Sequence, residues 1–90
     1  MPAVVITRRL PARIVAPLEN VATVDSGPGE GLPRETLLAR VAGADALICQ
    51  LTDRIDAEVI AAAPSLRVIA NVAVGHDNID LAAARARGIV

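Results

Sequence analysis

The residues of this 90-residue chain that could do chemistry gather in residues 71–80, Asn-Val-Ala-Val-Gly-His-Asp-Asn-Ile-Asp. Residues 66–70 before them have the composition of a buried strand, and residues 81–87 after them predict a helix. In an open parallel sheet, such a strand-to-helix connection lies at the carboxyl ends of the strands, where ligands bind. Gly75 allows a close backbone approach, and neighbouring N–H groups could hold a carboxylate or phosphate. The alternative is an ordinary turn in which Asp80 caps the next helix.

The composition excludes several classes of function. Nine basic and ten acidic residues are spread along the chain for a net charge of −1, which argues against nucleic-acid or anionic-membrane surfaces. Aromatic residues are absent, so no side chain can stack on a base or a flavin. Cys49 is the only cysteine, which excludes a disulfide or thiolate metal cluster and predicts a small buried apolar side chain. No apolar run approaches the roughly 18 residues of a membrane span, and no signal peptide opens the chain, so we expect a cytoplasmic protein.

Strand-like and helix-like segments alternate along the whole sequence. Strands are expected at residues 3–7, 21–25, 45–50, 66–72 and 89–90, and helices at residues 11–18, 33–43, 57–63 and 81–88. Pro17 predicts that the first helix is short or kinked. Asp56, like Asp80, is expected to cap the helix that follows it. The alternation specifies one α/β domain over residues 1–90, a flavodoxin-like doubly wound parallel sheet of order 2-1-3-4-5 that is truncated at the fifth strand.

Other candidate sites in this fold class are weaker. Residues 26–31 contain three glycines but neither the Walker nor the Gly-x-Gly-x-x-Gly spacing, so they predict a surface loop. A phosphoacceptor receiver needs acidic residues after the first strand, whereas residues 7–9 are Thr-Arg-Arg and would repel Mg²⁺. Residues 8–13 also lack the Gly, Ser or Thr of a flavin phosphate loop. The remaining class is a domain that binds a small organic acid, while another domain carries out the chemical step.

Three segments carry a resemblance to a known family. Residues 74–80, followed by an Ala-rich helix and Gly-Ile-Val at residues 88–90, resemble the Val-Gly-x-Asp-Asn-Ile-Asp signature of the D-2-hydroxyacid dehydrogenases. Residues 51–56, Leu-Thr-Asp-Arg-Ile-Asp, resemble the same family, and residues 5–11 are similar to its glyoxylate/hydroxypyruvate reductase branch. The resemblance covers essentially the whole chain, but only the N-terminal part of the family's chain.

The resemblance implies a substrate-binding domain. The backbone N–H groups of Val74 and Gly75 would hold the substrate carboxylate through charge-assisted hydrogen bonds, and the Leu51 side chain would pack against the substrate. The phosphoglycerate dehydrogenase branch has an arginine and a serine where this chain has Gln50 and Leu51. The missing positive charge disfavours a phosphorylated substrate, so the resemblance implies glyoxylate, hydroxypyruvate or a similar small 2-oxo or 2-hydroxy acid, bound weakly.

The family's catalytic equipment has no counterpart in these 90 residues. Hydride transfer in the family depends on a dinucleotide-binding domain with Gly-x-Gly-x-x-Gly and on an arginine, a carboxylate and a histidine. We therefore expect no catalytic, cofactor-binding or metal-binding residue here, an inactive isolated chain, and NADH or NADPH only in a parent enzyme. His76 falls at the variable position of the signature and predicts a solvated residue. Asp53, Arg54 and Asp56 are interpreted as loop solvation and capping, not as an acid/base set.

A second hypothesis remains open beside the enzyme fragment. The chain could be a stand-alone ligand-binding or self-associating module, a homo-oligomer formed through an uncovered sheet edge and apolar helix faces. The sequence leaves open the choice between a natural short protein and a truncated one, the exact 2-oxo acid, and the preference for NADH or NADPH.

Overall fold

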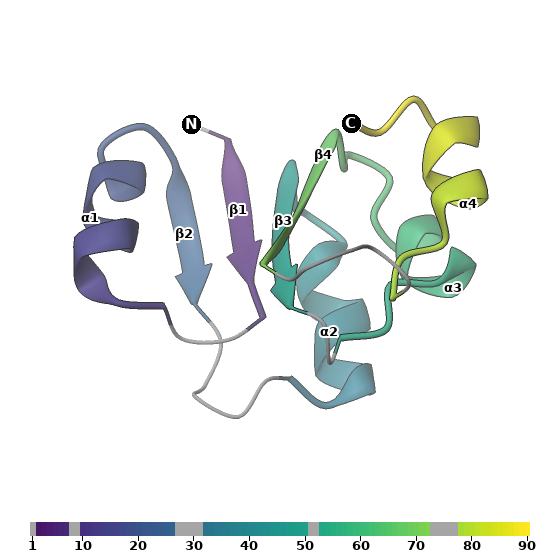
Figure 1. Ribbon diagram of the computed structural model, residues 1–90, viewed down its shortest axis with the longest axis horizontal. Coiled ribbons are helices and arrows are strands. Elements are labelled where there is room, and N and C mark those ends of the chain that lie inside the picture. Colours follow the sequence, from purple (N-terminus) through teal and green to yellow (C-terminus); the bar gives the residue numbers. More distant parts are fainter. Residues whose placement is uncertain (1, 8–9, 27–31, 51–52, 73–77) are drawn as a thin grey trace.

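A four-stranded parallel sheet forms the centre of the computed structural model, which describes residues 2–7, 10–26, 32–50, 53–72 and 78–90 (Figure 1). The strands are β1 (Ala3–Ile6), β2 (Thr23–Ser26), β3 (Ala46–Gln50) and β4 (Val68–Val72). Their order is β2-β1-β3-β4, and all three pairings are parallel. The predicted flavodoxin-like order is confirmed for these four strands.

Residues 89 and 90 lie beside β4 and bond to it. The Val90 N–H donates to the Arg67 carbonyl at 3.0 Å, and the Ile69 N–H donates to the Val90 carbonyl at 3.0 Å. This is the bonding that a parallel strand makes where it joins a sheet. It agrees with the expectation that a fifth strand begins here, next to the fourth.

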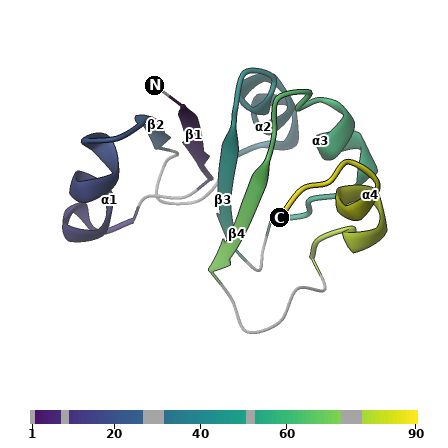
Figure 2. The same cartoon turned by 90° about the horizontal axis from the view of Figure 1, so that it is seen from above.

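Helices cover the two faces of the sheet unequally. The four helices are α1 (Ala12–Glu19), α2 (Arg34–Val41), α3 (Ala57–Ala61) and α4 (Leu81–Ala86). Helices α2, α3 and α4 lie on one face, whereas α1 lies on the other, beside β2 and β1 (Figure 2). None of the helices in the described part of the chain is long and apolar enough to cross a membrane.

Both predicted capping aspartates are confirmed. The Asp56 carboxylate accepts the Val59 N–H at 3.2 Å at the start of α3, and the Asp80 carboxylate accepts the Ala83 N–H at 3.0 Å at the start of α4. Each bond satisfies one of the N–H groups that a first helical turn leaves free. After α4, Gly88 has a φ of +69°, a left-handed conformation that glycine adopts without steric cost.

The core has two parts, one on each face of the sheet. The larger part, beneath α2, α3 and α4, includes Leu37, Val41, Leu47, Cys49, Ile55, Val59 and Ile60. The smaller part, beneath α1, consists of Val4, Ile6, Val15 and Ala22.

The two faces of β3 are buried to different extents. Leu47 and Cys49 are fully buried, but Ala46 and Ile48 on the opposite face are only partly covered. The reason is the position of α1, which lies beside β2 and β1, so that no described helix covers β3 and β4 on the same face (Figure 2).

Several element boundaries differ from the sequence prediction. The second strand begins at Thr23 rather than at residue 21, and Val21 is 63% exposed in the turn after α1. Helix α1 is short, as predicted, and contains Pro17, but its Ile14 is 53% exposed. Helix α3 ends at Ala61, and β4 begins at Val68 rather than at residue 66.

Candidate functional site

The predicted substrate-binding residues come soon after β3 and β4 in the sequence. Because β1, β3 and β4 are adjacent and parallel, the carboxyl ends of these strands lie at one edge of the sheet. Leu51, Val74, Gly75 and His76 themselves lie outside the described residues. The structure describes the residues on either side of them, and the contacts of these neighbouring residues are given below.

A buried hydrogen bond joins the end of β1 to the turn after β3. The Thr7 hydroxyl donates to Asp53 Oδ2 at 2.5 Å, and the Gln50 N–H donates to the same oxygen at 2.8 Å. Thr7 is fully buried, and Asp53 is 9% exposed. The prediction that Asp53 is a solvated loop residue is therefore wrong, because its carboxylate closes the turn from inside the protein. Its hydroxyl partner is 46 residues away in the sequence, which no local pattern reveals.

The side-chain amide of Asn78 connects the turn after β3 to the end of β4. Its Nδ2 group donates to the Gln50 carbonyl at 3.0 Å and to the Asp53 carbonyl at 2.8 Å. Its Oδ1 accepts a hydrogen bond from Asn71 Nδ2 at 2.8 Å. Residues 51–52 and residues 73–77 are thus each flanked by residues that Asn78 holds.

A backbone bridge reinforces this connection. The Ile55 N–H donates to the Asn78 carbonyl at 2.8 Å, and the Asp80 N–H donates to the Ile55 carbonyl at 2.8 Å. Ile55 is fully buried in the larger core, so the bridge is anchored by packing as well as by hydrogen bonds. The described residues beside the two segments that carry the predicted site residues are therefore fixed to each other.

Cys49 faces this region but cannot act as a nucleophile. Its Sγ lies 3.5 Å from Asn71 Oδ1, and the side chain is fully buried. Burial, with a further contribution from the negative charge of Asp53, raises the pKa of the Cys49 thiol to about 12. The thiolate is the reactive form of cysteine, so the thiol is inert near neutral pH. The expectation of a small buried apolar residue is confirmed.

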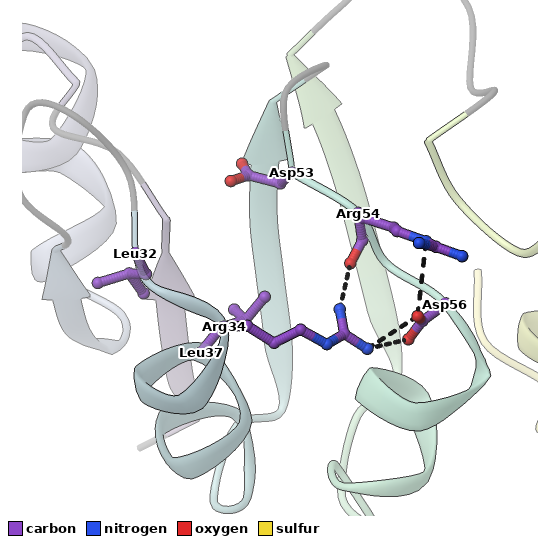
Figure 3. A pocket seen from close by; sticks show the side chains of 6 residues that line it. All are labelled: Leu32, Arg34, Leu37, Asp53, Arg54 and Asp56. Atoms are coloured by element: carbon purple, nitrogen blue, oxygen red, sulfur yellow. Dashed lines mark hydrogen bonds and ion pairs between the residues drawn. The ribbon is translucent and has the colours of Figure 1, made fainter.

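A separate pocket of about 300 Å³ lies between the amino ends of α2 and α3 (Figure 3). Arg34 Nη2 lies 2.7 and 2.8 Å from the two carboxylate oxygens of Asp56 and 2.8 Å from Glu58 Oε1. The hydrogen bond from Arg34 is the main reason that the pKa of Asp56 is below its usual range. Figure 3 shows the Asp53 carboxylate pointing away from this ion pair. The Arg34 side chain is already paired with the carboxylates of Asp56 and Glu58. It is therefore not available to bind an anion in this pocket.

The remaining predictions for this region concern charge and metal. The Arg54 side chain is 82% exposed, as expected of a solvated loop residue, and its Nε lies 3.7 Å from Asp56 Oδ2. Within the described ranges, no group of three or more His, Cys, Asp or Glu side chains is arranged to hold a metal ion.

Residues 4–90 match the family model of the catalytic domain of D-isomer specific 2-hydroxyacid dehydrogenases. The chain belongs to this family. Its curated relatives include glyoxylate reductases of Thermococcus kodakarensis, 48% identical over 98% of this chain, and of Pyrococcus horikoshii, 47% identical over 98%. The chain spans about a quarter of their length, 27% in both cases.

Solved structures of other proteins share the fold. A protein from Thermus thermophilus superposes with a TM-score of 0.91 at 48% identity, covering 97% of this chain and 28% of its own. An NAD⁺-bound 3-phosphoglycerate dehydrogenase of Entamoeba histolytica gives a TM-score of 0.85 at 26% identity, covering 99% of this chain and 31% of its own.

Sequence reasoning missed the roles of Thr7, Asn71 and Asn78. A signal for the two asparagines was present, because they lie seven residues apart at the two ends of the glycine-containing segment. Asparagine amides carry both donors and acceptors, so a pair of them at the ends of one loop is suited to close it. For Thr7 the sequence holds no such signal.

Proposed function

We propose that this chain is the substrate-binding part of an NAD(P)-dependent 2-hydroxyacid dehydrogenase that reduces a small 2-oxo acid such as glyoxylate or hydroxypyruvate. In this proposal the backbone N–H groups of Val74 and Gly75 hold the substrate carboxylate, and the Leu51 side chain packs against the substrate. The observation that supports it best is the set of hydrogen bonds of Asn78, which joins described residues beside the two segments that carry these residues. Similarity to glyoxylate reductases supports the substrate class.

The substrate is expected to be small and unphosphorylated. Gln50 at the end of β3 is neutral, and its backbone N–H and carbonyl are already used by Asp53 and Asn78. A phosphate would need a cation such as arginine at this place, with its forked donors. A carboxylate, with a single charge, can be held by two backbone N–H donors.

The rest of the reaction belongs to a partner domain. When bound, the nicotinamide cofactor supplies the hydride, and a dinucleotide-binding domain would have to present it to the substrate carbonyl. We also propose, on the sequence grounds above, that the 90-residue chain alone is catalytically inert and that the protein is cytoplasmic. The preference between NADH and NADPH would be set by the dinucleotide-binding domain, outside these residues.

A domain exchange tests the proposal. The matching N-terminal segment of the Thermococcus kodakarensis glyoxylate reductase is replaced by this chain, and oxidation of NADH and NADPH is measured with glyoxylate and hydroxypyruvate. We expect turnover from the chimaera and none above the blank from the 90-residue chain. A folded chimaera that binds cofactor but reduces neither acid would contradict the substrate assignment. Turnover by the chain alone that survives repurification would contradict its inertness.

Self-association is the second candidate function. On the face of the sheet that carries α1, Val68 is 41% exposed and Ala70 is also exposed, and no described helix covers this part of β4. A second copy could cover this apolar surface. Light scattering over a concentration series tests this candidate, and a constant monomer mass would count against it.

A further inference from the structure

We propose that Asn78 is a positioning residue, which holds Gln50 and Asp53, at and after the end of β3, next to Asn71 in β4 and thereby sets the fit of the substrate beside them. The inference rests on the proposed function, because it assigns a role to Asn78 within that same site. It deepens the proposal, since Asn78 is not among the residues expected to touch the substrate.

The first step is the place of the bonds that Asn78 makes. The carbonyls of Gln50 and Asp53 lie immediately before and after residues 51–52, and both accept from the same Asn78 Nδ2 at 3.0 and 2.8 Å. Asn71 precedes residues 73–77 by two positions, and its amide donates to Asn78 Oδ1 at 2.8 Å. A single side chain therefore bonds to described residues near both segments, although Gln50 is 28 residues away in the sequence.

The second step is the chemistry of the side chain. The Asn78 amide must donate to two carbonyls and accept from one amide N–H, and it is partly shielded from water. Aspartate has nearly the same shape but no N–H donor, and its charge would face two carbonyl oxygens at hydrogen-bond distance. Glutamine has the same groups on a longer stem, which would push the two segments apart. Of these three side chains, only asparagine matches both the length of the side chain and the donors and acceptor that the observed bonds require.

The third step is the consequence for binding. Neutral N–H donors hold a small anion well only when they are preorganised, because the ligand itself offers little binding energy to order a loop. The backbone bridge between Ile55 and Asn78 and the side-chain bonds of Asn78 supply this order without occupying the site. Loss of the amide should therefore weaken ligand binding without abolishing the fold.

The test uses the 90-residue chain labelled with ¹⁵N, as wild type and as the Asn78→Asp and Asn20→Asp variants. Asn20 is exposed at the end of α1, so Asn20→Asp makes the same chemical change away from the site. Amide hydrogen exchange reports how stably the residues around Asn78 are held. Titration with sodium glyoxylate, with sodium chloride as the salt control, reports ligand binding. In Asn78→Asp we expect the Ile55 and Asp80 amides to exchange about tenfold faster, the factor that corresponds to about 1.4 kcal/mol.

The same variant should raise the Kd for glyoxylate about fivefold or more, as expected when a preorganised site loosens. The Thr7 amide, which donates to Ile48 between β1 and β3, should exchange at the wild-type rate in both variants. A merely structural role would speed exchange throughout the sheet or leave the Kd unchanged, and either result overturns the positioning role. If wild type itself shows no saturable shifts with glyoxylate, the proposed function fails first, whatever the exchange data show.

Should Asn78→Asp not fold, Asn71→Ala provides the test. That change removes the bonds between Asn71 and Asn78 and the acceptor of the Cys49 thiol, but leaves the bonds from Asn78 to Gln50 and Asp53. We expect a smaller rise in the Kd for glyoxylate, about threefold, because only the side toward β4 is loosened. An unchanged Kd in a folded Asn71→Ala variant overturns the inference.

Discussion

Replacing Thr7 by valine tests the buried bond that joins β1 to the turn after β3. Valine keeps the shape of threonine but cannot donate to Asp53 Oδ2, which lies 2.5 Å from the Thr7 hydroxyl. Thr7 is fully buried, so no water replaces the lost donor at this position. A hydrogen bond to a charged group contributes about 1.5–3 kcal/mol, and we expect a loss of about 2 kcal/mol in the free energy of unfolding.

The assay is urea unfolding followed by far-ultraviolet circular dichroism, because the chain has no tryptophan or tyrosine to serve as a fluorescent probe. A loss of about 2 kcal/mol lowers the Tm of a domain of this size by about 8–16 °C. The urea m-value should not change, since the surface exposed on unfolding is the same.

Thr23→Val is the matched control, because Thr23 is exposed at the start of β2. The control should stay within about 0.5 kcal/mol of wild type. Asp53→Ala should lower the free energy of unfolding more than Thr7→Val does, since it leaves both the Thr7 hydroxyl and the Gln50 N–H without an acceptor. Equal stabilities of Thr7→Val and Thr23→Val would refute the reasoning, because the buried bond would then contribute nothing.

Two further predictions concern exposed arginines. The Arg87 guanidinium donates to three carbonyl oxygens at the end of α3 at 2.9 to 3.0 Å, so Arg87→Ala should cost about 1–2 kcal/mol in urea unfolding. Arg85→Ala, in the last turn of α4, is the control, and a loss as large as that of Arg87→Ala would show that the three bonds are not the cause. The hydrogen bond from Arg34 lowers the pKa of Asp56, so the stability it contributes is present above the unfolded pKa of about 3.9 and is lost as the pH falls below it. In Arg34→Ala the pKa of Asp56, followed by ¹³C NMR of the carboxyl carbon, should rise, and an unchanged pKa would contradict this account.

Much of the fold was predictable because its signals are local. Apolar runs of strand length and Ala-rich or Leu-rich segments between them gave the correct sequence of elements, and both capping aspartates were identified from their place before a helix. The right-handed crossover then restricts how such elements can be arranged, which is why the strand order could be inferred. Boundaries were less predictable. The second strand was placed two residues too early because Val21 has strand propensity, whereas the chain is still turning after α1.

The edge of the sheet at which β3 and β4 end was predictable, but the hydrogen bonds that connect the residues there were not. Position alone indicated that residues after β3 and β4 would meet, since both strands end at the same edge of the sheet. Asp53 was misinterpreted as solvated because an aspartate in a polar loop is usually exposed. Its burial depends on a threonine hydroxyl that the topology brings from the end of β1.

The sequence by itself determined the α/β class, the strand order, the helix caps and the resemblance of residues 74–80 to the dehydrogenase signature. These properties depend on spacing and composition within short segments, which the order of residues already contains. Only the tertiary structure decided that Asn78 binds Gln50 and Asp53, that Thr7 binds Asp53, and that one face of β3 and β4 is left partly open. Each of these depends on the distance between atoms that lie far apart in the chain, and packing of the sheet and helices sets that distance.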